Sequence, residues 1–126
     1  MKNKSSENGP LAVSKAYDFV LWLVQKVETF PRSHRFTIGD RLATNGLDLL
    51  TALVEASYTR DKASLLDAAS RKVNSTRLLL RMAKDLKLMS LDAYGFSATQ
   101  LDELGRMVGG WSKSALPLPL PLPLQP

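Results

Sequence analysis

Apolar residues recur at the spacing of helical turns in several stretches of this chain, and no stretch alternates apolar and polar residues as a half-buried strand would. The first predicted helix spans residues 11–30 and presents one apolar face. Pro31 ends it, because the residue before a proline disfavours helical backbone angles. The pattern predicts a second helix from about residue 36 to residue 59, with an apolar face wide enough to contact two neighbours.

A third predicted helix, over residues 61–88, carries two apolar stripes that are rotated relative to one another around its axis. The first stripe consists of Leu65, Leu66, Ala69, Val73 and Leu80, and the second of Leu79, Met82, Ala83 and Leu86. The polar residues 74–76 lie between the stripes. We therefore expect the two halves of this helix to pack against different neighbours.

The fourth predicted helix follows Ser90, which is a good N-cap residue because its hydroxyl can accept a hydrogen bond from a free backbone N–H group. Asp92 in the first turn is favoured by the helix dipole. One face of this helix is apolar and includes Trp111, which we expect in the core. Gly105 falls on the same face, where a missing side chain would let another helix approach closely.

Four amphipathic helices with short connections predict an all-α protein, an antiparallel up-down four-helix bundle over residues 10–114. Residues 1–9 are polar and are expected to be disordered, with Pro10 near the start of the first helix. Residues 115–126 read ALPLPLPLPLQP and are expected to form an extended, polyproline II-like tail. Such a tail could dock on an aromatic groove of a partner, or it could have no function.

The composition narrows the classes of function. The chain has 126 residues, too few for a two-part dinucleotide-binding fold or a TIM barrel. It contains no cysteine, which excludes disulfides and zinc–thiolate sites. The net charge of +5 suits a polyanionic partner such as nucleic acid, although many unrelated proteins share it. No apolar stretch is long enough to span a membrane and no secretory signal is visible, so we expect a soluble cytoplasmic protein.

No combination of residues indicates an enzyme. The single histidine, His34, lies in a predicted basic loop with only Ser33 nearby as a nucleophile. The Glu-x-x-His pattern of di-metal bundle proteins is absent, and the glycines match no phosphate-binding loop. We therefore expect no catalytic residue, no metal and no cofactor.

The basic residues are more informative, because they concentrate in the third predicted helix. Arg77, Arg81 and Lys84 share one face of it at the spacing that would follow a row of phosphates. Such a row would bind nucleic acid largely without regard to sequence, since phosphate contacts carry no base information. The other interpretation is a solvated surface in which Asp85 pairs with Arg81.

Trp22 projects on the polar side of the first predicted helix, and Leu21 also lies outside its apolar stripe. Because exposed tryptophan is rare and interfaces are rich in it, we expect this face to meet another subunit. Alternatively, a neighbouring helix of the same bundle covers Trp22.

Several segments together resemble the accessory variability determinant (Avd) proteins of diversity-generating retroelements. They are the region of Tyr17, the sequence FPRSHRF at residues 30–36, the pair Arg77 and Arg81, and the pattern E-x-G-R-x-x-G-x-W at residues 103–111. The last pattern is the most specific, and the order and spacing agree over about residues 13–114.

The resemblance implies a four-helix bundle that assembles into a homopentamer with a positively charged surface. It further implies binding to the retroelement's reverse transcriptase and to nucleic acid during mutagenic, adenine-directed copying of a template RNA. The matching residues implicate Arg77 and Arg81 in nucleic-acid binding, together with Arg32, His34 and the adjacent Arg35 of the predicted loop. Matching positions with expected structural roles are Gly105, Arg106 and Trp111.

Two alternatives remain open at the level of sequence. A related group of four-helix-bundle proteins, encoded in intervening sequences of bacterial large-subunit ribosomal RNA genes, shares the general pattern, which would imply a ribosome- or rRNA-associated protein. The other alternative is a purely structural oligomer whose only partner is protein.

Overall fold

The computed structural model describes residues 4–115, and within that range it contains four long helices and no strands. The long helices are α1 (Lys4–Val27), α3 (Asp40–Ser57), α4 (Ala63–Asp85) and α5 (Leu91–Ala115). Between α1 and α3 lie a short helix, α2 (Arg32–His34), and a π-helical segment, η1 (Arg35–Gly39). The predicted all-α, four-helix fold is confirmed.

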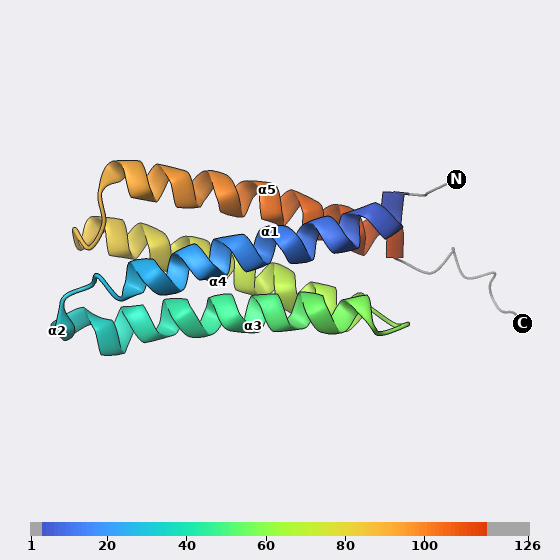
Figure 1. The fold of residues 1–126 in the computed structure, drawn as a ribbon, viewed down its shortest axis with the longest axis horizontal. Coiled ribbons are helices and arrows are strands. Elements are labelled where there is room, and N and C mark those ends of the chain that lie inside the picture. The colour runs from blue at the N-terminus through green and yellow to red at the C-terminus, as the bar shows by residue number, and fades with distance from the viewer. Residues whose placement is uncertain (1–3, 116–126) are drawn as a thin grey trace, which may run out of the picture.

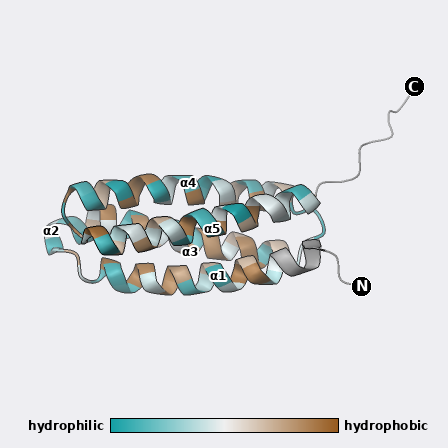
Figure 2. Ribbon diagram, turned by 90° about the horizontal axis from the view of Figure 1, so that it is seen from above, coloured by the Kyte–Doolittle hydropathy of each residue, from teal (hydrophilic) through white to brown (hydrophobic). Residues whose placement is uncertain are grey.

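Each long helix packs against two others, in the cyclic order α1, α3, α4, α5. Figure 1 shows the connections at alternate ends of the bundle, with Lys4 and Ala115 at the same end. Figure 2 shows apolar and polar residues alternating along every helix, as expected when each helix turns one face inward. The largest fully buried aliphatic side chains come from all four long helices: Leu23, Leu42, Leu49, Leu53, Leu66, Leu80, Leu101, Leu104 and Val108. No described helix has the length and apolarity required to cross a membrane.

The first helix begins earlier than the sequence predicts. We expected it to start at about residue 11 after a disordered segment, whereas α1 already begins at Lys4 and contains Pro10 in its interior. The reason is packing between the start of α1 and the last turns of α5: Gly9 is buried against α5, and an added Cβ there would lie 3.0 Å from Cζ2 of Trp111. Trp111 is buried, which confirms its predicted place in the core. The predicted Leu-Pro tail, from residue 116 onward, lies outside the described residues.

The second helical region begins at Arg32 and not near residue 36, so the predicted basic loop is itself helical. Pro31 has an extended backbone (ψ 151°) and acts as the N-cap residue. Its carbonyl oxygen accepts hydrogen bonds from the N–H groups of His34 (2.9 Å) and Arg35 (3.0 Å). Proline therefore starts this helix, because its missing N–H group is not needed at a helix start. It does not directly end the previous one, since α1 already ends at Val27, earlier than the predicted residue 30.

A polar interruption in α3, at residues 44–46, has a packing explanation. Gly46 faces α1, and an added Cβ would lie 3.0 Å from Cδ2 of Leu23, so glycine permits the close approach of α1 and α3. Asn45 is buried and donates a hydrogen bond through Nδ2 to Oγ of Ser75 on α4 (2.9 Å). The polar residues 44–46 of α3 thus meet the polar residues 74–76 of α4 through the hydrogen bond between Asn45 and Ser75.

The connection from α4 to α5 is fixed by hydrogen bonds at both helix ends. α4 ends at Asp85, earlier than the predicted residue 88. Lys87 then adopts a left-handed conformation (φ 62°), and the N–H of Leu88 reaches back to the carbonyl of Ala83 (2.9 Å), as in a Schellman motif. Ser90 Oγ accepts a hydrogen bond from the N–H of Ala93 (3.0 Å), which confirms Ser90 as the N-cap.

Candidate nucleic-acid interface and apolar groove

The predicted basic row on α4 is present, and acidic residues accompany two of its three cations. Arg77 Nη2 lies 3.2 Å from Oδ1 of Asp102 on α5. Lys84 Nζ lies 3.4 Å from Oδ1 of Asp85, so the pairing of Asp85 with Arg81 that the sequence suggested does not occur. Arg81 is exposed and forms no ion pair with any residue from 9 to 115.

These ion pairs do not commit the cations to a purely structural role. Arg77 and Asp102 are each about half exposed, with 45% and 56% of their side-chain surface in contact with solvent. Exposed pairs of this kind contribute little to stability, so a phosphate oxygen can replace the carboxylate at small cost. Lys84 is more restricted, because its ammonium group also lies 4.8 Å from the ring centroid of Tyr94.

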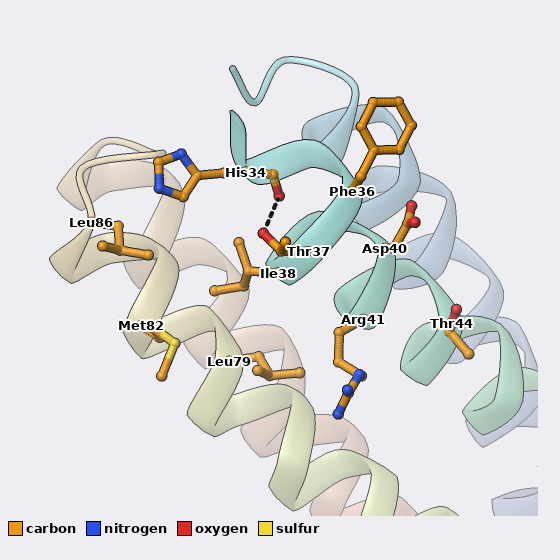
Figure 3. Close-up of a pocket in the computed structure, with 10 residues that line it drawn as sticks. All are labelled: His34, Phe36, Thr37, Ile38, Asp40, Arg41, Thr44, Leu79, Met82 and Leu86. Atoms are coloured by element: carbon orange, nitrogen blue, oxygen red, sulfur yellow. Dashed lines mark hydrogen bonds between the residues drawn. The ribbon is translucent and has the colours of Figure 1, made fainter. Parts of the chain in front are cut away.

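The basic segment at residues 32–35 lies at the end of the bundle where α4 finishes. His34 borders a groove that Leu86 of α4 also lines (Figure 3). Arg32 and Arg35 are both exposed. Arg35 also donates a hydrogen bond to the carbonyl of Phe30 (3.3 Å). The structure therefore places the basic segment at the same end of the molecule as Lys84 in the last turn of α4, whereas Arg77 lies farther along, opposite Asp102 near the middle of α5.

The groove beside His34 is apolar and was not predicted as a site. It has a volume of about 680 Å³ and lies between the start of the second helical region and the last turns of α4 (Figure 3). Its lining consists of His34, Phe36, Thr37, Ile38, Asp40, Arg41, Thr44, Leu79, Met82 and Leu86. Phe36, Met82 and Leu86 are 63%, 47% and 46% exposed, so large apolar side chains face solvent here.

The second apolar stripe of the third predicted helix is divided between the core and this groove. Ala83 is buried and Leu79 packs against the core, as expected of residues that face a neighbour. Met82 and Leu86 have no covering helix among the described residues and stay exposed instead. Phe36 was missed as a site residue, although an aromatic residue directly after a basic run was a visible signal in the sequence.

The structural roles expected of Gly105 and Arg106 in the 103–111 motif stay predictions. An added Cβ at Gly105 would lie 3.6 Å from Cγ1 of Val73 and 3.7 Å from Nη2 of Arg77, which are ordinary contact distances. Gly105 is therefore not required for helix packing, and it leaves space beside Arg77. Arg106 is exposed and forms no ion pair within residues 9–115. Glu103, by contrast, links the helices, because its Oε1 lies 3.2 Å from Nζ of Lys15 on α1.

Trp22 is partly covered by its own bundle. Its ring centroid lies 5.2 Å from that of Phe96 on α5 and 6.1 Å from that of Phe19. Leu21 is 48% exposed and, one turn earlier, Tyr17 is 57% exposed. The predicted subunit interface at Leu21 and Trp22 stays a prediction, with Leu21 as its more accessible member.

Ionisable side chains elsewhere do not gather into a metal site. Among the residues whose side chains the structure describes, 9–115, no group of three or more histidine, aspartate or glutamate residues is placed to hold a metal ion.

The fold and surface define a class of protein: a small helical bundle with a basic helix and an open apolar groove at one end. A family model described as bAvd-like matches residues 11–115, and the chain belongs to this bAvd-like family. The resemblance that we drew from the sequence to Avd proteins is thereby confirmed.

A known structure has a similar fold. It is a protein of unknown function from the S23 ribosomal protein family of Bacteroides thetaiotaomicron, with a TM-score of 0.78 and 14% sequence identity. The similarity covers 84% of this chain and 98% of that one. At such low identity it establishes the shared fold alone. A comparison with curated proteins gave no significant match.

Proposed function

We propose that this protein is a non-catalytic accessory subunit of a diversity-generating retroelement. It holds nucleic acid and the reverse transcriptase together in the cytoplasm during mutagenic reverse transcription of a template RNA. The proposal depends on one observation: this chain of the bAvd-like family carries Arg77, Arg81 and Lys84 on one face of α4. Membership of that family supports association with a reverse transcriptase, and the half-exposed cations support contact with phosphates.

The nucleic-acid surface consists of Arg77, Arg81 and Lys84 on α4, with Arg32, His34 and Arg35 at the same end of the bundle. Arg81 is the most available of the three α4 cations, because it is exposed and, unlike Arg77 and Lys84, has no acidic partner among residues 9–115. Binding is largely independent of sequence, because cations on a helix surface contact phosphates and not base edges.

In the proposed assembly, five antiparallel up-down bundles form a homopentameric ring through the face that carries Leu21 and Trp22. The exposure of Leu21 and Tyr17 supports this choice of face. A fivefold repeat multiplies a modest basic row into a large positive surface, and linked sites bind one long polyanion more tightly than separate ones do.

The apolar groove is the proposed contact for the reverse transcriptase. Phe36, Met82 and Leu86 are exposed in the isolated protein. A bound partner would bury them and so form the apolar centre that stable protein–protein contacts need. It lies at the same end as the cations, so one partner that already carries a template and its copy could touch both surfaces.

The proposal is tested by the salt dependence of nucleic-acid binding. The double substitution Arg77→Ala and Arg81→Ala should weaken binding of a labelled single-stranded RNA and lower the slope of log K against log[salt] by about 0.7 for each lost contact. Arg60→Ala with Arg71→Ala is the matched control, since it removes the same charge from outside the row. Equal affinities for the two double variants at low salt would contradict the assignment, provided that circular dichroism shows intact helices.

A ribosome- or rRNA-associated function is the second candidate, because the similar known structure comes from the S23 ribosomal protein family. Genomic neighbourhood separates the two: a reverse transcriptase gene with paired template and variable repeats supports the retroelement. Co-sedimentation of the protein with ribosomes from its own cells would favour the second candidate. Failure to retain any RNA or DNA at low salt would favour a purely structural oligomer instead.

A further inference from the structure

A polar recess lies between α4 and α5, separate from the apolar groove. It has a volume of about 370 Å³. Its polar border is formed by Ser70, Asn74 and Arg77 of α4 and by Asp102, Gly105 and Arg106 of α5. Two arginines from two different helices therefore border one small space, with a hydroxyl and an amide beside them.

The recess is open because Gly105 has no side chain. An added Cβ would lie 3.7 Å from Nη2 of Arg77, so any side chain longer than that of alanine would enter the space beside the guanidinium group. Packing does not explain this glycine, since a methyl group would make only ordinary contacts with Val73 and Arg77. Its effect is to leave room for a ligand atom next to Arg77.

The charges of the recess suit an anion with several oxygens. Arg77 and Arg106 supply two guanidinium groups, and Asp102 supplies one carboxylate, which lies against Arg77 at 3.2 Å. Arg106 forms no ion pair within the described residues. Guanidinium groups recognise phosphate through paired N–H donors, and the Ser70 hydroxyl and the Asn74 amide add neutral donors.

We propose that this recess binds a backbone phosphate of RNA or DNA between Arg77 and Arg106, and that Asp102 is a competitor that the phosphate displaces from Arg77. The inference rests on the proposed nucleic-acid binding. It adds to that proposal a defined phosphate site, a second arginine in Arg106, and an intramolecular competitor in Asp102. Arg81 and Lys84 follow Arg77 on successive turns of α4, so the same strand continues along them toward the end of the bundle.

The decisive substitution is Asp102→Asn, because it is expected to improve binding. It removes the competing carboxylate while keeping the shape of the side chain, so Arg77 is free to contact phosphate. Affinity for a labelled single-stranded RNA at low salt should rise roughly threefold or more, and the slope of log K against log[salt] should steepen by about 0.7 for the added contact.

Asp67→Asn is the matched control for Asp102→Asn. It also removes one negative charge from an ion pair on α4, the exposed pair of Asp67 with Arg71, but it lies outside the recess. Arg106→Ala should weaken binding by a similar factor, whereas Arg71→Ala should have a smaller effect. All four positions are exposed, and thermal melting followed by circular dichroism checks that each variant is folded.

The outcomes separate this site from the function on which it rests. If the wild-type protein binds RNA or DNA while Asp102→Asn behaves like Asp67→Asn, or Arg106→Ala like Arg71→Ala, the recess is not the phosphate site although the proposed function stands. If the wild-type protein retains neither RNA nor DNA at low salt, the proposed function and the site both fail. The site is supported if Asp102→Asn binds more tightly than Asp67→Asn and Arg106→Ala binds more weakly than Arg71→Ala.

Discussion

Gly9 of α1 packs against the indole ring of Trp111 of α5, so closely that a Cβ at Gly9 would lie 3.0 Å from Cζ2 of the ring. This contact joins the first described turns of the chain to the last helix. It also gives a packing reason for the helical backbone around Gly9 and Pro10, because Gly9 is buried against the indole.

The substitution Gly9→Val should therefore lower the free energy of unfolding by about 1–3 kcal/mol, because the added carbons overpack the indole. Gly109→Ala is the matched control, since nothing lies within 4 Å of a Cβ at Gly109. That change should raise stability by about 0.5–1 kcal/mol through helix propensity alone. Urea unfolding measures both, and equal effects of the same sign would contradict the contact.

Lys87 provides a second test, because it holds a left-handed conformation (φ 62°) directly after α4. Lys87→Gly should stabilise the protein by up to about 1 kcal/mol, since glycine adopts this conformation without a steric cost. Lys87→Ala removes the same charge but keeps the strain, so it should bring no such gain. Thermal melting of the two variants distinguishes relief of strain from loss of charge.

Thr76 is buried in α4, and its hydroxyl has no hydrogen-bond partner among the described residues. Thr76→Val removes the hydroxyl and keeps the shape of the side chain, so it should stabilise the protein by about 1 kcal/mol. Ser97 is the contrasting position, because its equally buried hydroxyl donates to the carbonyl of Tyr94 at 2.7 Å. Ser97→Ala should be neutral or destabilising in the same urea titration, and a gain at Ser97 with none at Thr76 would refute this explanation.

The apolar groove gives a prediction about the protein partner. Met82→Gln with Leu86→Gln should reduce capture of the reverse transcriptase at least tenfold, because polar amides replace the apolar surface that the contact would bury. RNA binding by the isolated protein should change little, since no charge is altered. Leu11→Gln with Leu47→Gln is the control pair, with two leucines of similar exposure that lie outside the groove. If the groove variant captured the reverse transcriptase as well as the wild type does, the enzyme would have to bind another surface of the bundle.

Much of the fold could be predicted from the sequence, because regular amphipathic spacing depends on neighbours in the chain. Ser90 as N-cap and Trp111 as a core residue follow from local rules and are confirmed. The start of α1 was missed because the buried surface that stabilises it belongs to Trp111, far away in the sequence.

The candidate site was less predictable, because it depends on which helices become neighbours. The sequence places Arg77 on a basic face, but its pairing with Asp102 arises only when α4 and α5 lie together. The groove likewise depends on the π-helical segment Arg35–Gly39, which supplies Phe36, Thr37 and Ile38 to its lining and which no simple residue pattern indicates.

Lys4 and Ala115 lie at one end of the bundle, opposite the end that carries the groove and the cations (Figure 1). The connection between α3 and α4 lies at the same end as these two residues. Protein segments fused at either end of the described chain therefore leave the proposed binding end uncovered. For the same reason the bundle is well suited to circular permutation: a short linker can join residue 115 to residue 4, and new termini can be opened near residue 60 without interrupting a helix.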